Sequence, residues 1–232
     1  LIDEDHDRRV RMAHLSIVGS HKVNGVSALH SELLVQTIFA DFAALWPERF
    51  VNVTNGVTPR RWLAQANGGL AGLLDTHIGT AWRRDLTQLA RLRPLAADAD
   101  FRRAFLAVKR ANKERLARTI AATTGIAVDP GSLFDVQVKR IHEYKRQLLN
   151  LLQVVARYQA MLEEPHKDWL PRTVLFAGKA ASSYVAAKSV IRLIHDVGTV
   201  INADTRLQGR LKVVFVPNYS VSVAEVIMPG AD

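Results

Sequence analysis

Three short apolar runs alternate with two long amphipathic segments in the second half of the chain. The apolar runs are residues 133–139, 173–178 and 211–218, and the helical patterns between them are 146–162 and 182–198. Apolar strands that alternate with helices of this length predict a parallel sheet covered by helices, and hence an α/β fold. In such sheets, ligands bind beyond the carboxyl ends of the strands.

The segment after the first of these strands has an unusual charge pattern. In DVQVKRIHEYKRQLLN, residues 135–150, four cations gather where a strand should become a helix, and Glu143 is the one acid among them. A helix N-terminus already carries partial positive charge, so each exposed cation there costs roughly 0.3–1 kcal/mol unless an anion offsets it. Helix N–H groups with Lys and Arg predict a phosphate site. The alternative, left equally open by the spacing, is a solvated basic turn. The cations are Lys139, Arg140, Lys145 and Arg146.

The ends of the other two strands, Gly178-Lys179 and Asn218-Tyr219, carry weaker signals. A P-loop needs Gly five residues before the Gly-Lys pair and Ser or Thr directly after it, but Thr173 and Ala180 stand there. We therefore interpret Gly178 as part of a tight strand-to-helix turn. The eight histidines show no metal-binding spacing, although His142 could donate a hydrogen bond to an anion.

The first half of the chain is predicted to be mainly helical. Ser27 is the expected N-cap of one helix that ends at Pro47, and Asn24-Gly25 and Asn55-Gly56 are predicted turns. Residues 60–125 follow a helical pattern with expected breaks at Asn67-Gly68-Gly69 and at Pro94. Their last part is a clear amphipathic helix that Gly125 ends.

Two details of the later helices follow from their periodicity. The helix over residues 182–198 is expected to end at Gly198. In the helix over residues 146–162, one face is expected to gather the apolar side chains. These are Leu148, Leu151, Leu152, Val155 and Leu162.

Composition narrows the class of protein. The chain has 232 residues, 48% hydrophobic, which suits one or two domains. It has no cysteine, which excludes disulfides, and no apolar run near the roughly 20 residues of a membrane span. The net charge of +9 calls for anionic partners such as phosphorylated small molecules or nucleic acid. Leu1 in place of Met indicates an excised piece, a processed product or a partial reading.

Five motifs carry a resemblance to a known family. They are SHKVNGVSALHSELL, TNGVTPRRWL, SLFDVQVKRIHEYKRQLLN, FAGKAA and NYSVSVAE. Together and in this order they closely resemble the α-glucan phosphorylase family, which includes glycogen and maltodextrin phosphorylases. The resemblance covers essentially the whole chain.

The resemblance implies a glycosyltransferase-B-like α/β fold with the active site between two domains. Residues 1–56 would be the C-terminal end of the N-terminal catalytic domain, and residues 57–232 the first part of a Rossmann-like C-terminal domain that binds pyridoxal phosphate (PLP). The implied reaction is the retaining phosphorolysis of α-1,4-glucan by inorganic phosphate to glucose 1-phosphate, with the PLP phosphate as acid–base group. The resemblance also implies a cytoplasmic homodimer that binds neither membranes nor nucleic acid.

The resemblance assigns substrate roles residue by residue. Arg140 and Lys145 match the residues that hold the substrate phosphate, and His142 matches a supporting position beside them. Cations suit this role because two neighbouring phosphate dianions repel each other strongly unless they are neutralised. The positions that match contacts to the glucosyl unit are Val26, Asn55 and Tyr144.

The resemblance also assigns cofactor contacts, and the chain departs from the family in three places. Lys139 and Tyr219 match contacts to the PLP phosphate, and Trp62 matches an aromatic residue that lines the cofactor pocket. Ser220 stands where many members carry Arg, and Gly230 stands where Ala is usual. The family's cofactor lysine lies in a GTGNMK segment that the sequence does not reach, so we expect the isolated chain to be inactive and to expose large apolar patches.

A non-enzymatic function is the alternative to the phosphorylase interpretation. The chain could be a non-catalytic basic α/β module that binds phosphorylated ligands or nucleic acid through its positive charge. A complete protein that releases glucose 1-phosphate would decide between the two.

Overall fold

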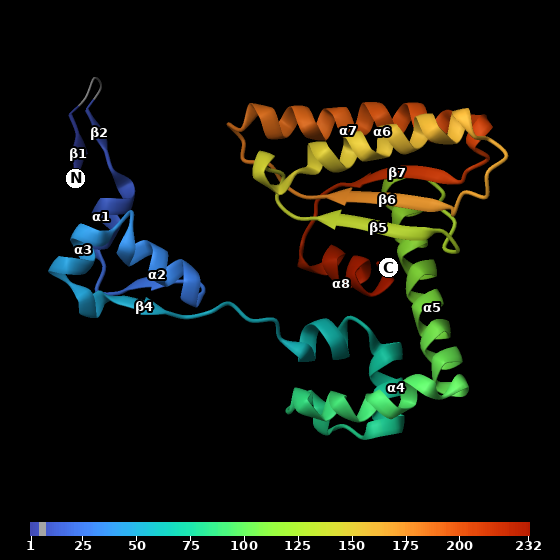
Figure 1. The fold of residues 1–232 in the computed structure, drawn as a ribbon, viewed down its shortest axis with the longest axis horizontal. Helices are drawn as coiled ribbons and strands as arrows, with labels where there is room; N and C mark the ends of the chain where they lie inside the picture. Colours follow the sequence, from blue (N-terminus) through green and yellow to red (C-terminus); the bar gives the residue numbers. More distant parts are fainter. Residues whose placement is uncertain (5–7) are drawn as a thin grey trace. The chain divides into compact units, whose positions relative to one another are not determined.

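The chain forms two compact units, Leu1–Val57 and Thr58–Asp232, in a computed structural model that describes residues 1–4 and 8–232. In Figure 1 the first unit is blue, and the second runs from teal to red. Residues 53–58, at the boundary, have no regular secondary structure. Each unit is described by itself below.

The first unit combines short strands with short helices. β1 and β2 pair antiparallel, whereas β3 and β4 pair parallel with Val23 opposite Phe50. Parallel pairing needs a crossover connection, which the helices between β3 and β4 supply. The elements are β1 (Ile2–Asp3), β2 (Arg9–Val10), α1 (Met12–Gly19), β3 (Val23–Gly25), α2 (Ala28–Gln36), α3 (Ala40–Leu45), the 3-10 turn η1 (Pro47–Arg49) and β4 (Phe50–Asn52).

The helix predicted from Ser27 to Pro47 is present but broken. Ser27 caps it as expected, since its hydroxyl accepts a hydrogen bond from the backbone N–H of His30. At Thr37 the backbone leaves the helical region, with φ −125° and ψ −94°, and the segment resumes as α3. The prediction of one continuous helix is therefore wrong.

The two turns predicted in this unit are also wrong. Asn24-Gly25 closes strand β3, and Gly25 is there because α2 comes close: a Cβ on it would lie 1.9 Å from the Ser31 hydroxyl oxygen. Asn55-Gly56 lies in the irregular residues 53–58, where no turn forms. No hairpin forms there because no strand follows β4 before the helical residues that begin at Pro59.

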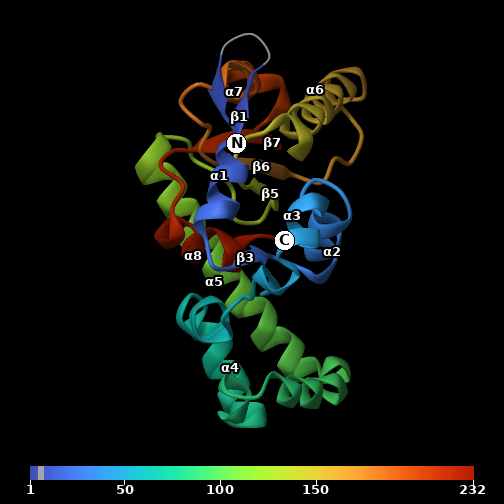
Figure 2. The same cartoon turned by 90° about the vertical axis from the view of Figure 1, so that its left-hand side faces the viewer.

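The second unit begins with a helical segment. Asn67 caps α4, and Asp98 caps the long helix α5, which ends as predicted at Gly125 in the left-handed conformation (φ 72°). Pro94 lies inside the 3-10 helix η4, which continues to Ala97, so the break predicted at Pro94 is wrong. The elements are η2 (Arg60–Gln65, π-helical), α4 (Gly68–Ile78), η3 (Ala81–Arg83), η4 (Leu86–Ala97) and α5 (Ala99–Thr124). Figure 2 shows α5 reaching from the sheet to the helices around α4.

The rest of the second unit is the predicted parallel α/β fold. The three strands are parallel, in the order β5-β6-β7, with Phe134 opposite Thr173 and Thr173 opposite Lys212. The elements are β5 (Leu133–Val138), η5 (Glu143–Lys145), α6 (Gln147–Glu163), β6 (Arg172–Ala177), α7 (Val185–Ala203), η6 (Thr205–Leu207), β7 (Leu211–Val216) and α8 (Val221–Gly230). Within the described residues, no helix has the length and apolarity that crossing a bilayer requires.

Helices cover both faces of this sheet (Figure 1). On one face, α6 and α7 bury Leu151, Val154 and Ile194 against Val174 and Phe176 of β6. On the other face, α5 and α8 pack against the sheet. Their shared core includes Leu116, Ile120, Phe134, Leu175, Val214 and Ile227. A three-layer core of this kind fixes the strand ends, which carry the polar segments described next.

Two details of the helices differ from the periodicity. The helix α7 continues through Gly198 to Ala203, because Gly198 lets the helix lie close to β7: a Cβ there would meet the Val213 carbonyl oxygen at 3.3 Å. In α6 the buried face contains Leu151, Val154 and Met161, whereas Leu148 and Leu152, expected on that face, are 45% and 55% exposed. The second error arises because apolar spacing alone does not fix which side of a helix meets the sheet.

Candidate active site

The carboxyl ends of the three strands bring three polar segments to one edge of the sheet. Residues 139–146 follow β5, Gly178-Lys179 follows β6, and Asn218-Tyr219 follows β7. Because the strands are parallel and in register, these segments lie side by side. The edge predicted for ligand binding is therefore the edge where the basic stretch lies.

Gly178 lets the first two segments approach closely. A Cβ on Gly178 would lie 1.9 Å from the backbone oxygen of Lys139, and φ at this glycine is +157°. The Lys139 N–H donates to the Ala177 oxygen at 3.0 Å, and the Ile141 N–H donates to the Lys179 oxygen at 3.1 Å. The prediction of a tight strand-to-helix turn at Gly178 is therefore wrong: the chain turns only at residues 182–183, and α7 begins at Val185. Gly178-Lys179 instead continues beside residues 139–141, whose backbone hydrogen-bonds to it.

The basic stretch does not pass directly from strand to helix. Lys139 lies at a bend, residues 140–142 have no regular secondary structure, and His142 is extended. Then η5 makes one 3-10 turn, and Arg146 adopts the left-handed conformation (φ 61°) before α6 begins at Gln147. A non-glycine residue in this region costs roughly 1–2 kcal/mol and persists only where the surroundings hold it. We call residues 139–146 the basic loop.

The cations of the basic loop have no acidic partner among residues 1–4 and 8–232. In the part of the chain that the structure describes, none of the four forms an ion pair with a carboxylate. The nearby acid, Glu143, instead accepts a hydrogen bond from the Tyr184 hydroxyl at 2.5 Å, and this bond raises the pKa of Tyr184. Lys139, Arg140 and Arg146 are exposed and Lys145 is half-buried, so an external anion can reach them.

Aromatic rings stand beside these cations. The His142 ring lies 4.4 Å from the Tyr144 ring and 4.9 Å from the Tyr184 ring, centre to centre. The Lys145 ammonium lies 5.5 Å from the Tyr144 ring centre. His142, Tyr144 and Lys145, which were predicted to act together, are thus brought together by the structure. Tyr184 was not predicted, because it lies 42 residues after His142 and only the fold brings the two together.

Tyr219 and Ser220 follow the end of β7. Tyr219 is half-buried against the core under α5 and α8, and burial raises the pKa of its hydroxyl. The hydroxyl of Ser220 caps α8 by accepting from the Val223 N–H, and it also bonds to the Ser222 hydroxyl at 3.0 Å. Ser220, which departs from the family pattern, therefore has a structural partner in this chain.

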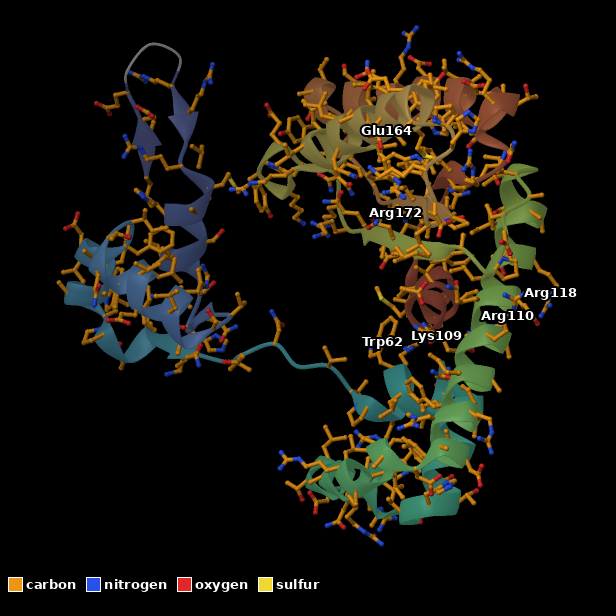
Figure 3. The ribbon with its side chains drawn as sticks, turned by 45° about the vertical axis from the view of Figure 1, so that its right-hand side comes forward. Trp62, Lys109, Arg110, Arg118, Glu164 and Arg172 are labelled. Atoms are coloured by element: carbon orange, nitrogen blue, oxygen red, sulfur yellow. The ribbon has the colours of Figure 1, made fainter. Side chains whose placement is uncertain are left out.

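Trp62 comes from another part of the second unit. It is half-buried in η2, which Arg61 ties to α8 through an ion pair with Glu225 (2.6 Å). In Figure 3, Trp62 and Lys109 lie on the α8 side of α5, and Arg118 lies on its outer side. The structure therefore places Trp62 near α8.

Val26 and Asn55 belong to the first unit, whereas the other predicted site residues belong to the second. The Asn55 N–H donates to the Val26 oxygen at 3.3 Å, so these two residues lie together. Both side chains are exposed. The predicted glucosyl contacts are thus divided between the two units, with Tyr144 in the second.

Comparison with known proteins identifies the family of the chain. The family model described as "Carbohydrate phosphorylase" matches residues 1–232. The chain is 60% identical over its whole length to a glycogen phosphorylase of Pasteurella multocida and 59% identical to one of Haemophilus influenzae, covering 28% of each relative. It is 48% identical over 227 residues to "Alpha-glucan phosphorylase 2, cytosolic" of Arabidopsis thaliana, covering 96% of this chain and 27% of that protein. The chain therefore spans little more than a quarter of the length of these relatives. The match over every residue shows that the chain belongs to the carbohydrate phosphorylase family.

Proposed function

We propose that this chain is part of an α-1,4-glucan phosphorylase that releases glucose 1-phosphate from glycogen or maltodextrin with retained configuration. The observation that carries the proposal is the basic loop: four cations at the carboxyl edge of a parallel sheet, with no carboxylate partner among the described residues. A charge cluster of this kind is stabilised when an anion binds. Inorganic phosphate is the anion that such a reaction requires.

We assign the two units to two domains of a glycosyltransferase-B-like fold. The first unit would be the end of the N-terminal catalytic domain, and the second the first part of the Rossmann-like C-terminal domain. Three parallel strands with helices on both faces support the second assignment. Val26 and Asn55 would then contribute glucosyl contacts from one domain, and Tyr144 from the other.

The residues of the second unit fit a PLP phosphate group. Lys139 offers an ammonium with no carboxylate partner in the described chain, and Tyr219 offers a half-buried hydroxyl at the same edge of the sheet. Both are hydrogen-bond donors, as a phosphate requires, and Trp62 adds an aromatic face near α8. When bound, the cofactor would supply its phosphate as the acid–base group of the reaction.

The remaining residues of the basic loop would act on the substrate phosphate. Arg140 and Lys145 would neutralise its charge and hold it against the repulsion of a second phosphate group. His142, between the Tyr144 and Tyr184 rings, would orient a hydrogen bond toward the same anion. These charges would stabilise the transition state in which the glycosidic bond breaks.

The test is glucose 1-phosphate release by the complete phosphorylase that contains this segment, with inorganic phosphate and maltoheptaose. In that enzyme we expect Lys145→Ala to lower turnover at least about 100-fold, as the loss of a transition-state electrostatic partner does. The matched control is Lys167→Ala, because Lys167 is an exposed lysine before β6, at the amino end of the sheet. Near-normal turnover in Lys145→Ala would refute the phosphate assignment.

The non-catalytic basic module is the weaker proposal, because a family of carbohydrate phosphorylases matches the whole chain. We further propose that the complete protein binds α-1,4-glucan, phosphate and glucose 1-phosphate as a homodimer in the cytoplasm. The name of the cytosolic Arabidopsis relative supports the location. Unchanged mass at all concentrations in light scattering, at the value of one chain, would contradict the dimer.

A further inference from the structure

A buried amide lies directly under the basic loop. Gln147, the first residue of α6, is 1% exposed. Its Nε2 donates to the backbone oxygen of Arg140 at 3.1 Å, and its Oε1 accepts from the backbone N–H of His142 at 3.3 Å. A buried amide is costly unless its donor and acceptor are both used, and here each bonds to the backbone of the same loop.

These two bonds take the place of a missing strand. In a parallel sheet, a residue opposite position i donates to the oxygen of i−1 and accepts from the N–H of i+1. The Gln147 side chain makes this pair of bonds around Ile141, whose own N–H bonds to Lys179 on the other side. Residues 139–142 are therefore held on both sides, by the β6 extension and by a side-chain amide.

The other end of the loop is fixed in a similar way. The Gln137 Nε2 donates to the backbone oxygen of Lys145 at 3.0 Å, and the Asn150 Nδ2 donates to the Gln137 Oε1 at 2.9 Å. Amides from β5 and α6 thus bond to the backbone at Arg140, His142 and Lys145. The side chains of these three residues, in contrast, form no ion pair with a carboxylate in the described chain, so their positions depend on the backbone that carries them.

We infer that Gln147 is a positioning residue, which holds the backbone of Arg140 and His142 so that their side chains converge with Lys145 on one phosphate. The inference rests on the proposed function, because it concerns the same anion site. Preorganised charges stabilise a transition state without the cost of reorganisation, and a small misplacement of the group that binds substrate weakens catalysis strongly. Gln147 itself touches no substrate in this scheme.

The test is Gln147→Met in the complete phosphorylase, since Met matches the length of Gln but makes neither hydrogen bond. Gln153→Met is the matched control, because Gln153 is exposed on the same helix. Hydrogen exchange of the segment 140–146 and the KM values for inorganic phosphate and for maltoheptaose are measured in both. If Gln147→Met does not fold, Gln147→Asn, whose shorter amide cannot reach both backbone groups, takes its place.

We expect exchange at His142 and the KM for phosphate each to rise roughly tenfold in Gln147→Met, the effect of losing one or two hydrogen bonds, while the KM for maltoheptaose changes less than about twofold. Gln153→Met should match the wild type in all three. Unchanged exchange, or KM values that rise together, would assign Gln147 a general structural role and overturn the inference. A wild-type enzyme without phosphate-dependent release would instead refute the proposed function, while the exchange measurement would still report on the bonds of Gln147.

Discussion

The amino edge and the carboxyl edge of the sheet differ in whether their cations are paired with carboxylates. At the amino edge, Arg172 pairs with Asp135 at 2.9 Å, and Arg206 pairs with Asp204 at 2.7 Å. At the carboxyl edge, the basic loop has its cations without carboxylate partners among the described residues. Paired charges are neutralised within the fold, whereas unpaired charges of one sign are available to a ligand.

The net charge of +9 does not show which of the cations already have a counter-ion and which do not. Composition counts the Arg172 and Arg206 guanidinium groups equally with those of the basic loop, although the first two already have their counter-ions. Position within the fold separates them, because the amino edge is formed by strand starts and the carboxyl edge by strand ends. The cations proposed to bind phosphate are those without a carboxylate partner in the part of the chain that the structure describes.

The largest loss of stability should come from substitution of Gly178, the glycine that lies against the basic loop. In Gly178→Ala the new Cβ would meet the Lys139 backbone oxygen at 1.9 Å, so the loop must move away from β6. We expect a loss of about 3 kcal/mol in the free energy of unfolding, at the upper end of what overpacking costs, and a raised KM for phosphate. Urea unfolding and phosphate kinetics of the complete enzyme measure both.

The matched control for this substitution is Gly72→Ala. Gly72 lies inside α4 with no atom near its would-be Cβ. Ala has the higher helix propensity, so this variant should be more stable by about 0.5–1 kcal/mol. Equal stability of Gly178→Ala and the wild type would mean that the loop can shift freely, and the contrast between the two edges would lose its structural basis.

A substitution at the amino edge of the sheet should lower the stability of the fold by a smaller amount, and this loss should depend on pH. Hydrogen bonds from Arg206 and then Tyr158 hold the pKa of Asp204 below its usual value of 3.8. A carboxyl group with a lowered pKa stabilises the fold above pH 4 and loses that contribution as it becomes protonated in acid. Asp204→Asn should therefore melt below the wild type at pH 7, and the gap should narrow as the pH falls below 4.

Melting temperatures of both proteins between pH 3 and pH 8 measure this gap. Asp196→Asn is the control, because the Asp196 carboxylate is 65% exposed and lies 3.8 Å from Arg192. It should show almost no gap at any pH, as a surface pair contributes little. A constant gap for Asp204→Asn across this range would show that the carboxylate charge does not stabilise the amino edge.

The sequence predicted the parallel sheet and its three strand ends correctly. The apolar runs of β5, β6 and β7 are long enough to be recognised as strands without knowledge of their tertiary contacts. The sequence also placed the basic loop at a strand end. It did not predict the hydrogen bonds of the Gln147 side chain to the loop backbone or the contact of Tyr184 with His142. Both depend on side chains that only the folded chain brings together. Residue type gave no signal for either one.

The errors at glycine positions have a different origin. Asn24-Gly25 has the composition of a turn, but Gly25 serves the close approach of Ser31. The same chemical property of glycine, the missing Cβ, supports a turn in one place and tight packing in another. At Gly198 the sequence suggested a helix end for the same reason, whereas the structure uses the space against β7.

The smallest effect should come from Arg146, the cation of the basic loop to which no role is assigned. Its left-handed backbone costs roughly 1–2 kcal/mol for a non-glycine residue, and glycine loses about 0.5–1 kcal/mol more entropy on folding, so Arg146→Gly should change stability by less than about 1 kcal/mol. Gln208→Gly is the matched control, because Gln208 is also left-handed (φ 52°) but uncharged and follows η6, before β7. We expect both variants to keep the KM for phosphate within about threefold, as the loss of one solvated charge does. A rise of about tenfold in Arg146→Gly alone would mean that Arg146 also contacts the phosphate, and all four cations of the carboxyl edge would then be ligand-binding.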